Sequence, residues 1–205
     1  METMSEPLVE YGVAKFILPG QGESGDQHLV RCGGNGILIA AIDGIGHGEE
    51  AASAANAAVS ILKAGADEPV ISLVQRCPEG LRATRGVVLS LATIEPEHGM
   101  MTWLGVGNVQ GVLMRAGSKK GASQEVLLLR AGVVGSQLPA LQAAVIPVAK
   151  GDTLVFVTDG IGGEFAEGLS ALESPQRMAD RILKQHCRGK DDALALVVRL
   201  TGVRA

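Results

Sequence analysis

The chain has 205 residues, of which 46% are hydrophobic and 20% are charged, and its formal net charge is −4. This balance excludes intrinsic disorder, because it supplies enough apolar surface to build a packed core. It also argues against binding of nucleic acids, since the chain is mildly acidic and has only five aromatic side chains on which bases could stack. The length predicts one domain that spans residues 1–205.

The N-terminal residues, the apolar runs and the cysteines predict a cytoplasmic protein that does not enter a membrane. Residues 1–7 lack the basic and apolar regions of a secretory signal. The longest apolar run, residues 36–42, is about a third of the length that spans a bilayer. Cys32, Cys77 and Cys187 are scattered and form no Cys-x-x-Cys pair, which is typical of free thiols in a reducing compartment.

Short strand-like segments dominate the chain and are interrupted by a few helical ones. Residues 36–42 are apolar throughout, as in a strand that is buried on both faces. Residues 48–64 predict a helix, because small and apolar side chains recur at three- and four-residue spacing from Ala51 to Leu62. In chain order we expect strands at 8–18, 27–32, 36–42, 87–94, 100–106, 109–115, 125–130, 143–148, 152–158 and 194–200, helices at 48–64, 70–76 and 175–187, and turns at Gly99, Asn108 and 117–121. This order predicts an α+β fold with layered sheets.

Aspartates stand at the ends of several predicted strands. Asp43 and Asp159 each end an apolar run and are followed by glycine-rich sequence, Asp26 precedes a strand, and Asp191 and Asp192 precede the last strand. Clustered carboxylates repel one another in a low-dielectric cleft, and a divalent cation such as Mg²⁺ or Mn²⁺ relieves that repulsion. Asp-Gly is also a common turn dipeptide, so the pattern by itself allows either a turn or an acidic metal site.

Other kinds of chemistry have less support in the residues. The glycine-rich stretch 44–48 does not complete the dinucleotide-binding pattern G-x-G-x-x-G, because Glu49 stands where the last glycine is needed. The four histidines form no H-x-x-x-H pattern, and no G-x-S-x-G sequence presents a nucleophilic serine. Metal-assisted hydrolysis is therefore the reaction class that these residues favour.

With these residues in place, the chain resembles the protein phosphatase 2C-type (PPM) bacterial serine phosphatases. Residues 42–48, Ile-Asp-Gly-Ile-Gly-His-Gly before an alanine-rich helix, are similar to that family's Asp-Gly-x-Gly-His-Gly segment. Gly25-Asp26 resembles its earlier Gly-Asp motif, residues 151–160 resemble its Gly-Asp-x-Leu…Thr-Asp-Gly strand, and residues 190–194 resemble its terminal Asp-Asp/Asn motif. The motifs occur in the family's order and are most similar to the group that contains the stage II sporulation phosphatase and stress-response phosphatases.

The resemblance implies a layered α-β-β-α sandwich of two antiparallel sheets flanked by helices, with two Mn²⁺ or Mg²⁺ ions at one edge. Asp43 would bridge both ions, and a water activated by them would attack phosphorus. His47 would protonate the leaving oxygen or, alternatively, serve only in the structure of its loop. Asp192 would hold the ligand residues in place without binding the ions itself. The full implied ligand set is Asp26, Asp43, the carbonyl of Gly44, Asp159 and Asp191.

The activity implied by the resemblance is hydrolysis of phosphoserine or phosphothreonine on phosphorylated stressosome scaffold proteins. The chain begins directly with its first predicted strand, which favours a stand-alone enzyme of that group. Two alternatives remain at this point: a non-catalytic module of the same fold that binds a phosphoprotein or scaffold, and a metal hydrolase of small phosphate esters. The sequence shows no counterpart of the N-terminal arginine that grips phosphate in eukaryotic relatives.

Overall fold

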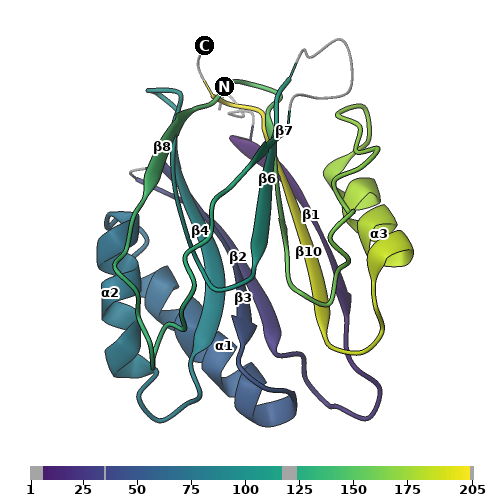
Figure 1. Ribbon diagram of the computed structural model, residues 1–205. Helices are drawn as coiled ribbons and strands as arrows, with labels where there is room; N and C mark the ends of the chain where they lie inside the picture. The colour runs from purple at the N-terminus through teal and green to yellow at the C-terminus, as the bar shows by residue number, and fades with distance from the viewer. Residues whose placement is uncertain (1–6, 35, 117–123, 204–205) are drawn as a thin grey trace, which may run out of the picture.

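The computed structural model describes residues 7–34, 36–116 and 124–203 and forms two antiparallel five-stranded sheets (Figure 1). The first sheet has the strand order β1-β10-β9-β6-β7, with bounds Val9–Phe16, Ala193–Leu200, Thr153–Val157, Gln110–Met114 and Gln124–Val126. The second sheet has the order β2-β3-β4-β5-β8, with bounds Asp26–Gly33, Gly36–Gly44, Val87–Glu95, Met100–Val106 and Ala144–Pro147. The predicted α+β class with two antiparallel sheets is confirmed.

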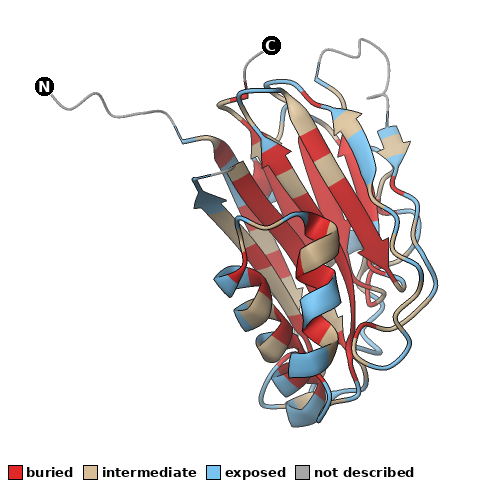
Figure 2. Ribbon diagram, turned by 90° about the vertical axis from the view of Figure 1, so that its left-hand side faces the viewer, coloured by how far each residue is buried: buried red, intermediate tan, exposed pale blue. Residues whose placement is uncertain are grey.

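Three helices cover the outer faces of the two sheets. Helices α1 (Gly48–Ala64) and α2 (Val70–Gly80) pack on the second sheet, and α3 (Pro175–His186) packs on the first (Figure 1). Figure 2 shows the buried sides of α1 and α2 turned toward the sheet and their exposed sides turned to solvent. The layers therefore follow the order α-β-β-α that was expected.

Strand β3 shows why an apolar run without alternation belongs in the middle of this sandwich. Ile37 and Ile39 face the core between the sheets, whereas Leu38 and Ile42 face the core beneath α1 and α2. Both faces of the strand are thus covered, because the other sheet lies on one side and the helices lie on the other. Small alanines on α1 let the helix approach closely, and Ala51, Ala54, Ala55 and Ala58 are fully buried.

Most of the predicted elements are confirmed, and two are corrected. Helix 48–64 has the bounds that we expected, but α2 runs to Gly80 and includes Pro78, because its buried face continues to Cys77. The predicted strand at 125–130 is wrong beyond Val126. There the backbone changes partners: Leu127 N–H donates to Gly111 in the first sheet, and Arg130 N–H donates to Gly105 in the second.

Two further expectations concern turns and membranes. Gly99 has a φ of +61° between β4 and β5 and is a turn residue, as predicted. The predicted turn at 117–121 lies outside the described residues. No described helix is both long enough and apolar enough to cross a membrane.

Candidate functional site

Both sheets bring acidic strand ends to one edge of the sandwich. Asp26 begins β2 and lies opposite Asp43, near the end of β3, in the antiparallel register. In the first sheet, Asp159 follows β9, and Asp191 and Asp192 precede β10. A hydrogen bond joins the two sheets here, since the hydroxyl of Thr158 donates to Oδ2 of Asp26 at 2.6 Å.

Three of these carboxylates share a cavity of about 370 Å³. Its wall includes Asp43, Asp159 and Asp191, together with Ile45, Gly46, Val88, Gly107, Asn108, Ala131 and Gly132. Asp26 lies behind this wall and is only 2% exposed. The predicted aspartates are therefore brought together from segments that are far apart in the sequence.

Asn108 is a member of the site that the sequence did not identify. We expected it only as a turn residue between two strands, but its side-chain amide donates a 2.8 Å hydrogen bond to Oδ2 of Asp159. No motif marks this residue, because its role depends on the packing of the β5–β6 connection beside the end of β9.

Burial and mutual repulsion make two of the carboxyl groups hard to ionise. The pKa of Asp26 is raised to about 7, mainly because burial disfavours the charged form, although the hydrogen bond from Thr158 opposes the shift. The pKa of Asp43 is raised to about 8 by burial first and then by the negative charges of Asp26, Asp159, Asp191 and Asp192. The negative charge of these carboxylates exceeds the positive charge that could compensate it. A divalent cation relieves such an imbalance.

Asp192 holds the neighbouring loop in place. Its carboxylate is 5% exposed and accepts hydrogen bonds from the backbone N–H of Leu18 at 2.8 Å and of Gly25 at 2.7 Å. These two bonds fix the chain that leads into Asp26 against the chain that leads into β10. Asp192 therefore joins the backbone segments of this edge, and it does not line the cavity.

The glycines after Asp43 and Asp159 both stand where another backbone segment packs closely, and Gly160 also lies in a turn, in which the N–H of Ile161 donates to the carbonyl of Thr158 at 3.1 Å. A Cβ atom on Gly44 would lie 2.1 Å from the carbonyl oxygen of Ala51, and one on Gly160 would lie 2.0 Å from that of Asp192. Neither Gly44 nor Gly160 has a positive φ. Both Asp-Gly pairs thus mark places where a neighbouring backbone packs against the strand end, and the second pair is a turn as well.

His47 occupies a different place from the carboxylates. It is the N-cap residue of α1, it is exposed, and its side chain makes no capping hydrogen bond. It does not belong to the wall of the acidic cavity, although Ile45 and Gly46 from the same loop do.

The residues at this edge suit oxygen-ligated divalent cations in type and in charge. Carboxylate and carbonyl oxygens are the ligands that Mg²⁺ and Mn²⁺ take, and burial first, then the neighbouring carboxylates, raise the pKa values of Asp26 and Asp43. Among the described residues, however, no three His, Cys, Asp or Glu side chains are arranged to hold a metal ion as they stand. The carboxylates line a common cavity and do not form a compact ligand shell.

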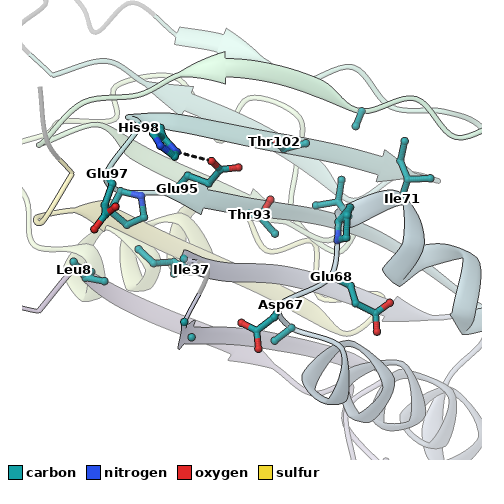
Figure 3. Close-up of a pocket in the computed structure, with 18 residues that line it drawn as sticks. Leu8, Ile37, Asp67, Glu68, Ile71, Thr93, Glu95, Glu97, His98 and Thr102 are labelled. Atoms are coloured by element: carbon teal, nitrogen blue, oxygen red, sulfur yellow. Dashed lines mark hydrogen bonds and ion pairs between the residues drawn. The ribbon is translucent and has the colours of Figure 1, made fainter.

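A larger cavity, of about 710 Å³, lies at the opposite end of the second sheet. Figure 3 shows its wall, with Asp67, Glu68, Glu95 and Glu97 around it and His98 hydrogen-bonded to Glu95. It contains none of the predicted site residues. Its acidic side chains come from the α1–α2 connection, from the last residue of β4 and from the turn that follows it, so the smaller cavity is the candidate site.

The fold is that of the protein phosphatase 2C class of structures. A solved structure of the PP2C phosphatase domain of SpoIIE from Bacillus subtilis matches with a TM-score of 0.76 at 19% identity, covering 96% of this chain and 64% of that one. The family model for stage II sporulation protein E (SpoIIE) matches residues 33–201. The chain therefore belongs to the SpoIIE family.

Two further relatives are similar along nearly their whole length. The phosphoserine phosphatase RsbX of Bacillus subtilis (strain 168) is 24% identical over 183 residues, which covers 89% of this chain and 90% of RsbX. A crystal structure of RsbX in complex with magnesium has a TM-score of 0.82 at 22% identity and covers 94% of this chain and 96% of that one. A structure described as "The bacterial stressosome: a modular system that has been adapted to control secondary messenger signaling" has a TM-score of 0.83 at 26% identity. The match covers 93% of this chain and 99% of that one.

Proposed function

We propose that the protein is a metal-dependent phosphatase that hydrolyses phosphoserine and phosphothreonine in proteins. The observation that carries the proposal is the acidic cavity, in which Asp43, Asp159 and Asp191 from two different sheets line one space. The similarity to the phosphoserine phosphatase RsbX, over nine-tenths of its length, supports the same activity.

In the proposed site, two Mn²⁺ or Mg²⁺ ions are held by Asp26, Asp43, the carbonyl of Gly44, Asp159 and Asp191. When bound, such ions lower the pKa of a coordinated water toward neutrality and provide the nucleophile for attack on phosphorus. The carboxylates bind the ions. Asn108 fixes one oxygen of Asp159 through its 2.8 Å hydrogen bond. Thr158 restrains Asp26, because its hydroxyl donates to Asp26 and also accepts from the N–H of Leu194 at 2.8 Å.

His47 is proposed as the proton donor to the leaving serine oxygen. It stands one residue beyond Gly46, which lines the cavity, and histidine is the side chain that most often serves as a general acid. p-Nitrophenolate is a stable leaving group that needs no proton. We therefore expect His47→Gln to lower kcat on a phosphoserine peptide by about ten-fold to a hundred-fold, and to change kcat on p-nitrophenyl phosphate by less than about three-fold. Equal losses on both substrates would assign His47 a structural role.

The proposed physiological substrates are phosphorylated stressosome scaffold proteins. We also propose that residues 1–205 act as one catalytic domain and that the protein works in the cytoplasm. The relatives RsbX and the stressosome structure support this substrate class. The three free cysteines suit a reducing compartment. A folded phosphorylated scaffold protein should be hydrolysed with a higher kcat/KM than the phosphopeptide excised from it, and equal efficiencies would contradict recognition of the folded partner.

The direct test is hydrolysis of p-nitrophenyl phosphate with Mn²⁺, with and without a chelator, by the wild type and by Asp43→Asn. We expect activity that requires Mn²⁺ and that the substitution abolishes. Activity that survives both treatments would overturn the metal mechanism.

A non-catalytic module that binds a phosphoprotein is the second candidate. It is favoured by one observation, the absence of a compact ligand shell among the described side chains. In that case the wild type would bind a phosphorylated partner but would show no hydrolysis with Mn²⁺ or Mg²⁺, whereas the phosphatase proposal requires turnover under those conditions.

A further inference from the structure

Arg85 is not part of the wall of the acidic cavity, but its side chain lies beside the wall residue Gly46, and no sequence motif includes it. It lies between α2 and β4, and a Cβ atom built on Gly46 would be 2.9 Å from its Nη1 atom and 3.7 Å from its Cδ atom. Gly46 is part of the cavity wall. The guanidinium group therefore lies against the backbone at the rim of the site.

Hydrogen bonds on both sides of Arg85 fix the position of its backbone relative to the cavity. The N–H of Ile45 donates to the carbonyl of Gly86 at 3.0 Å, and Val87 pairs with Gly44 at the end of β3. The hydroxyl of Thr84 accepts from the N–H of Gly86 and donates to the carbonyl of Leu81. These bonds join the segment before β4 directly to the loop that follows Asp43.

The side chain of Arg85 is exposed and makes no hydrogen bond or ion pair with any residue in the described ranges. The nearby Arg188 differs, since its Nη1 atom donates to the carbonyl oxygen of Asp159 at 3.4 Å. Arg85 thus keeps its five N–H donors available at the edge of a strongly acidic space.

Glycine at position 46 is what lets the guanidinium approach the loop. Gly46 has a φ of +110°, which other residues rarely adopt, and a methyl group there would collide with the Arg85 side chain. The glycine-rich sequence 44–48 therefore leaves room for a cation from another element.

We propose that Arg85 binds the phosphoryl group of the substrate at the entrance to the acidic cavity. A phosphate monoester dianion is repelled by carboxylates, and a guanidinium group offers it a fork of two parallel charge-assisted hydrogen bonds. Arg85 takes the role for which the sequence offered no N-terminal arginine, from a different element of the fold. The inference rests on the proposed phosphatase function, because it assigns the substrate group that the arginine recognises.

The test compares the wild type with Arg85→Ala and Arg85→Lys, and uses Arg82→Ala as the matched control. Arg82 is an exposed arginine three residues earlier in the same segment, and it is not among the nearest neighbours of Gly46, which all belong to Arg85. Binding of inorganic phosphate is followed by ³¹P NMR in the presence of saturating Mg²⁺, and hydrolysis of p-nitrophenyl phosphate is measured in parallel. Circular dichroism melting shows that each variant is folded, and Mg²⁺ affinity is measured separately for each.

Arg85→Ala should weaken phosphate binding and raise KM by about ten-fold to a hundred-fold, as expected for the loss of hydrogen bonds to a charged group. Arg85→Lys should fall between the wild type and alanine, because it keeps the charge and loses the fork. Arg82→Ala and the Mg²⁺ affinities should stay within about two-fold of wild type.

The binding and activity measurements separate the two proposals. If Arg85→Ala binds phosphate as the wild type does, or if the wild type binds none, the role of Arg85 is overturned. If the wild type binds phosphate through Arg85 but hydrolyses no phosphate ester, the proposed function fails while the role of Arg85 in binding stands.

Discussion

The two ends of the second sheet are both acidic, but they hold their carboxylates in different ways. At one end, Asp26 is almost fully buried, and the pKa of its partner Asp43 is raised to about 8. At the other end, Glu95 and Glu97 are exposed, and Glu68 is paired with Arg76 around a cavity nearly twice as large (Figure 3).

This contrast shows that neither cavity size nor the number of acidic residues identifies the site. At the larger cavity the carboxylates are solvated or paired with cations, whereas at the smaller one Asp26 is buried, Asp43 and Asp159 are half-buried and Asp191 is exposed. Buried carboxylates that repel one another are costly to keep and are typical of functional sites. We therefore assign the proposed chemistry to the smaller cavity, at the edge where β2 begins and β3 ends.

The largest expected effect comes from a matched pair of substitutions, one at each end of the sheet. Asp159→Asn should lower Mn²⁺-dependent kcat/KM by more than about a hundred-fold, beyond the range typical of residues that only support a metal ligand. Glu97→Gln at the larger cavity makes the same chemical change and should leave kcat/KM within about two-fold. The comparison of the two ends would be wrong if both substitutions reduced turnover alike.

A smaller effect is expected at Asp192, which positions the acidic edge without lining the cavity. Asp192→Ala removes two hydrogen bonds from backbone N–H groups to a charged acceptor, those of Leu18 and Gly25. We expect a loss of about 3 kcal/mol in the free energy of unfolding and a ten-fold to hundred-fold loss of Mn²⁺ affinity.

Asp192→Asn is the control for that prediction, because the amide keeps one acceptor oxygen and a similar shape. It should lie between the wild type and the alanine variant in both thermal melting and Mn²⁺ titration. An alanine variant that melts and binds Mn²⁺ as the wild type does would show that these bonds do not organise the site.

The smallest effect concerns stability as a function of pH in chelator-treated protein. Asp26 and Asp43 have pKa values of about 7 and about 8 when folded, against an ordinary value of 3.8. Between pH 4 and pH 8 the folded chain thus binds more protons than the unfolded chain, so the free energy of unfolding falls as the pH rises. No such penalty applies below pH 4, where the carboxyl groups are protonated in both states.

Asp43→Asn should therefore stabilise the chelator-treated protein at pH 8 and have little effect at pH 4. A gain of about 1 kcal/mol corresponds to a rise of roughly 2–4 °C in the melting temperature for a chain of this size. Glu95→Gln at the exposed end is the control and should not alter the pH profile. A melting temperature of Asp43→Asn that matches the wild type at both pH values would contradict the repulsion described for this edge.

The sequence predicted the parts of the molecule that depend on local patterns. The apolar run 36–42 had to be covered on both faces, and the spacing of alanines gave the bounds of α1. The aspartates were recognised because each stands at the end of an apolar strand, where a carboxylate is out of place without a partner or ligand.

The sequence could not predict contacts that arise from the packing of separate segments. Asn108 reaches the cavity wall and Arg85 reaches Gly46 through connections whose conformations are set by neighbouring strands, and no spacing in the chain encodes those distances. The strand predicted at 125–130 failed for the same reason, since its residues divide their hydrogen bonds between two sheets. The role of the glycines after Asp43 and Asp159 also needed the neighbouring backbone to be seen.

The most direct test of the account is a Mn²⁺ titration of the full chain, followed by electron paramagnetic resonance, for the wild type and for the double variant Asp43→Asn with Asp159→Asn. We predict two Mn²⁺ ions bound by the wild type, and at least a hundred-fold weaker binding by the double variant. Equal stoichiometry and affinity in the two proteins would contradict the claim that the carboxylates of this cavity hold the metal ions.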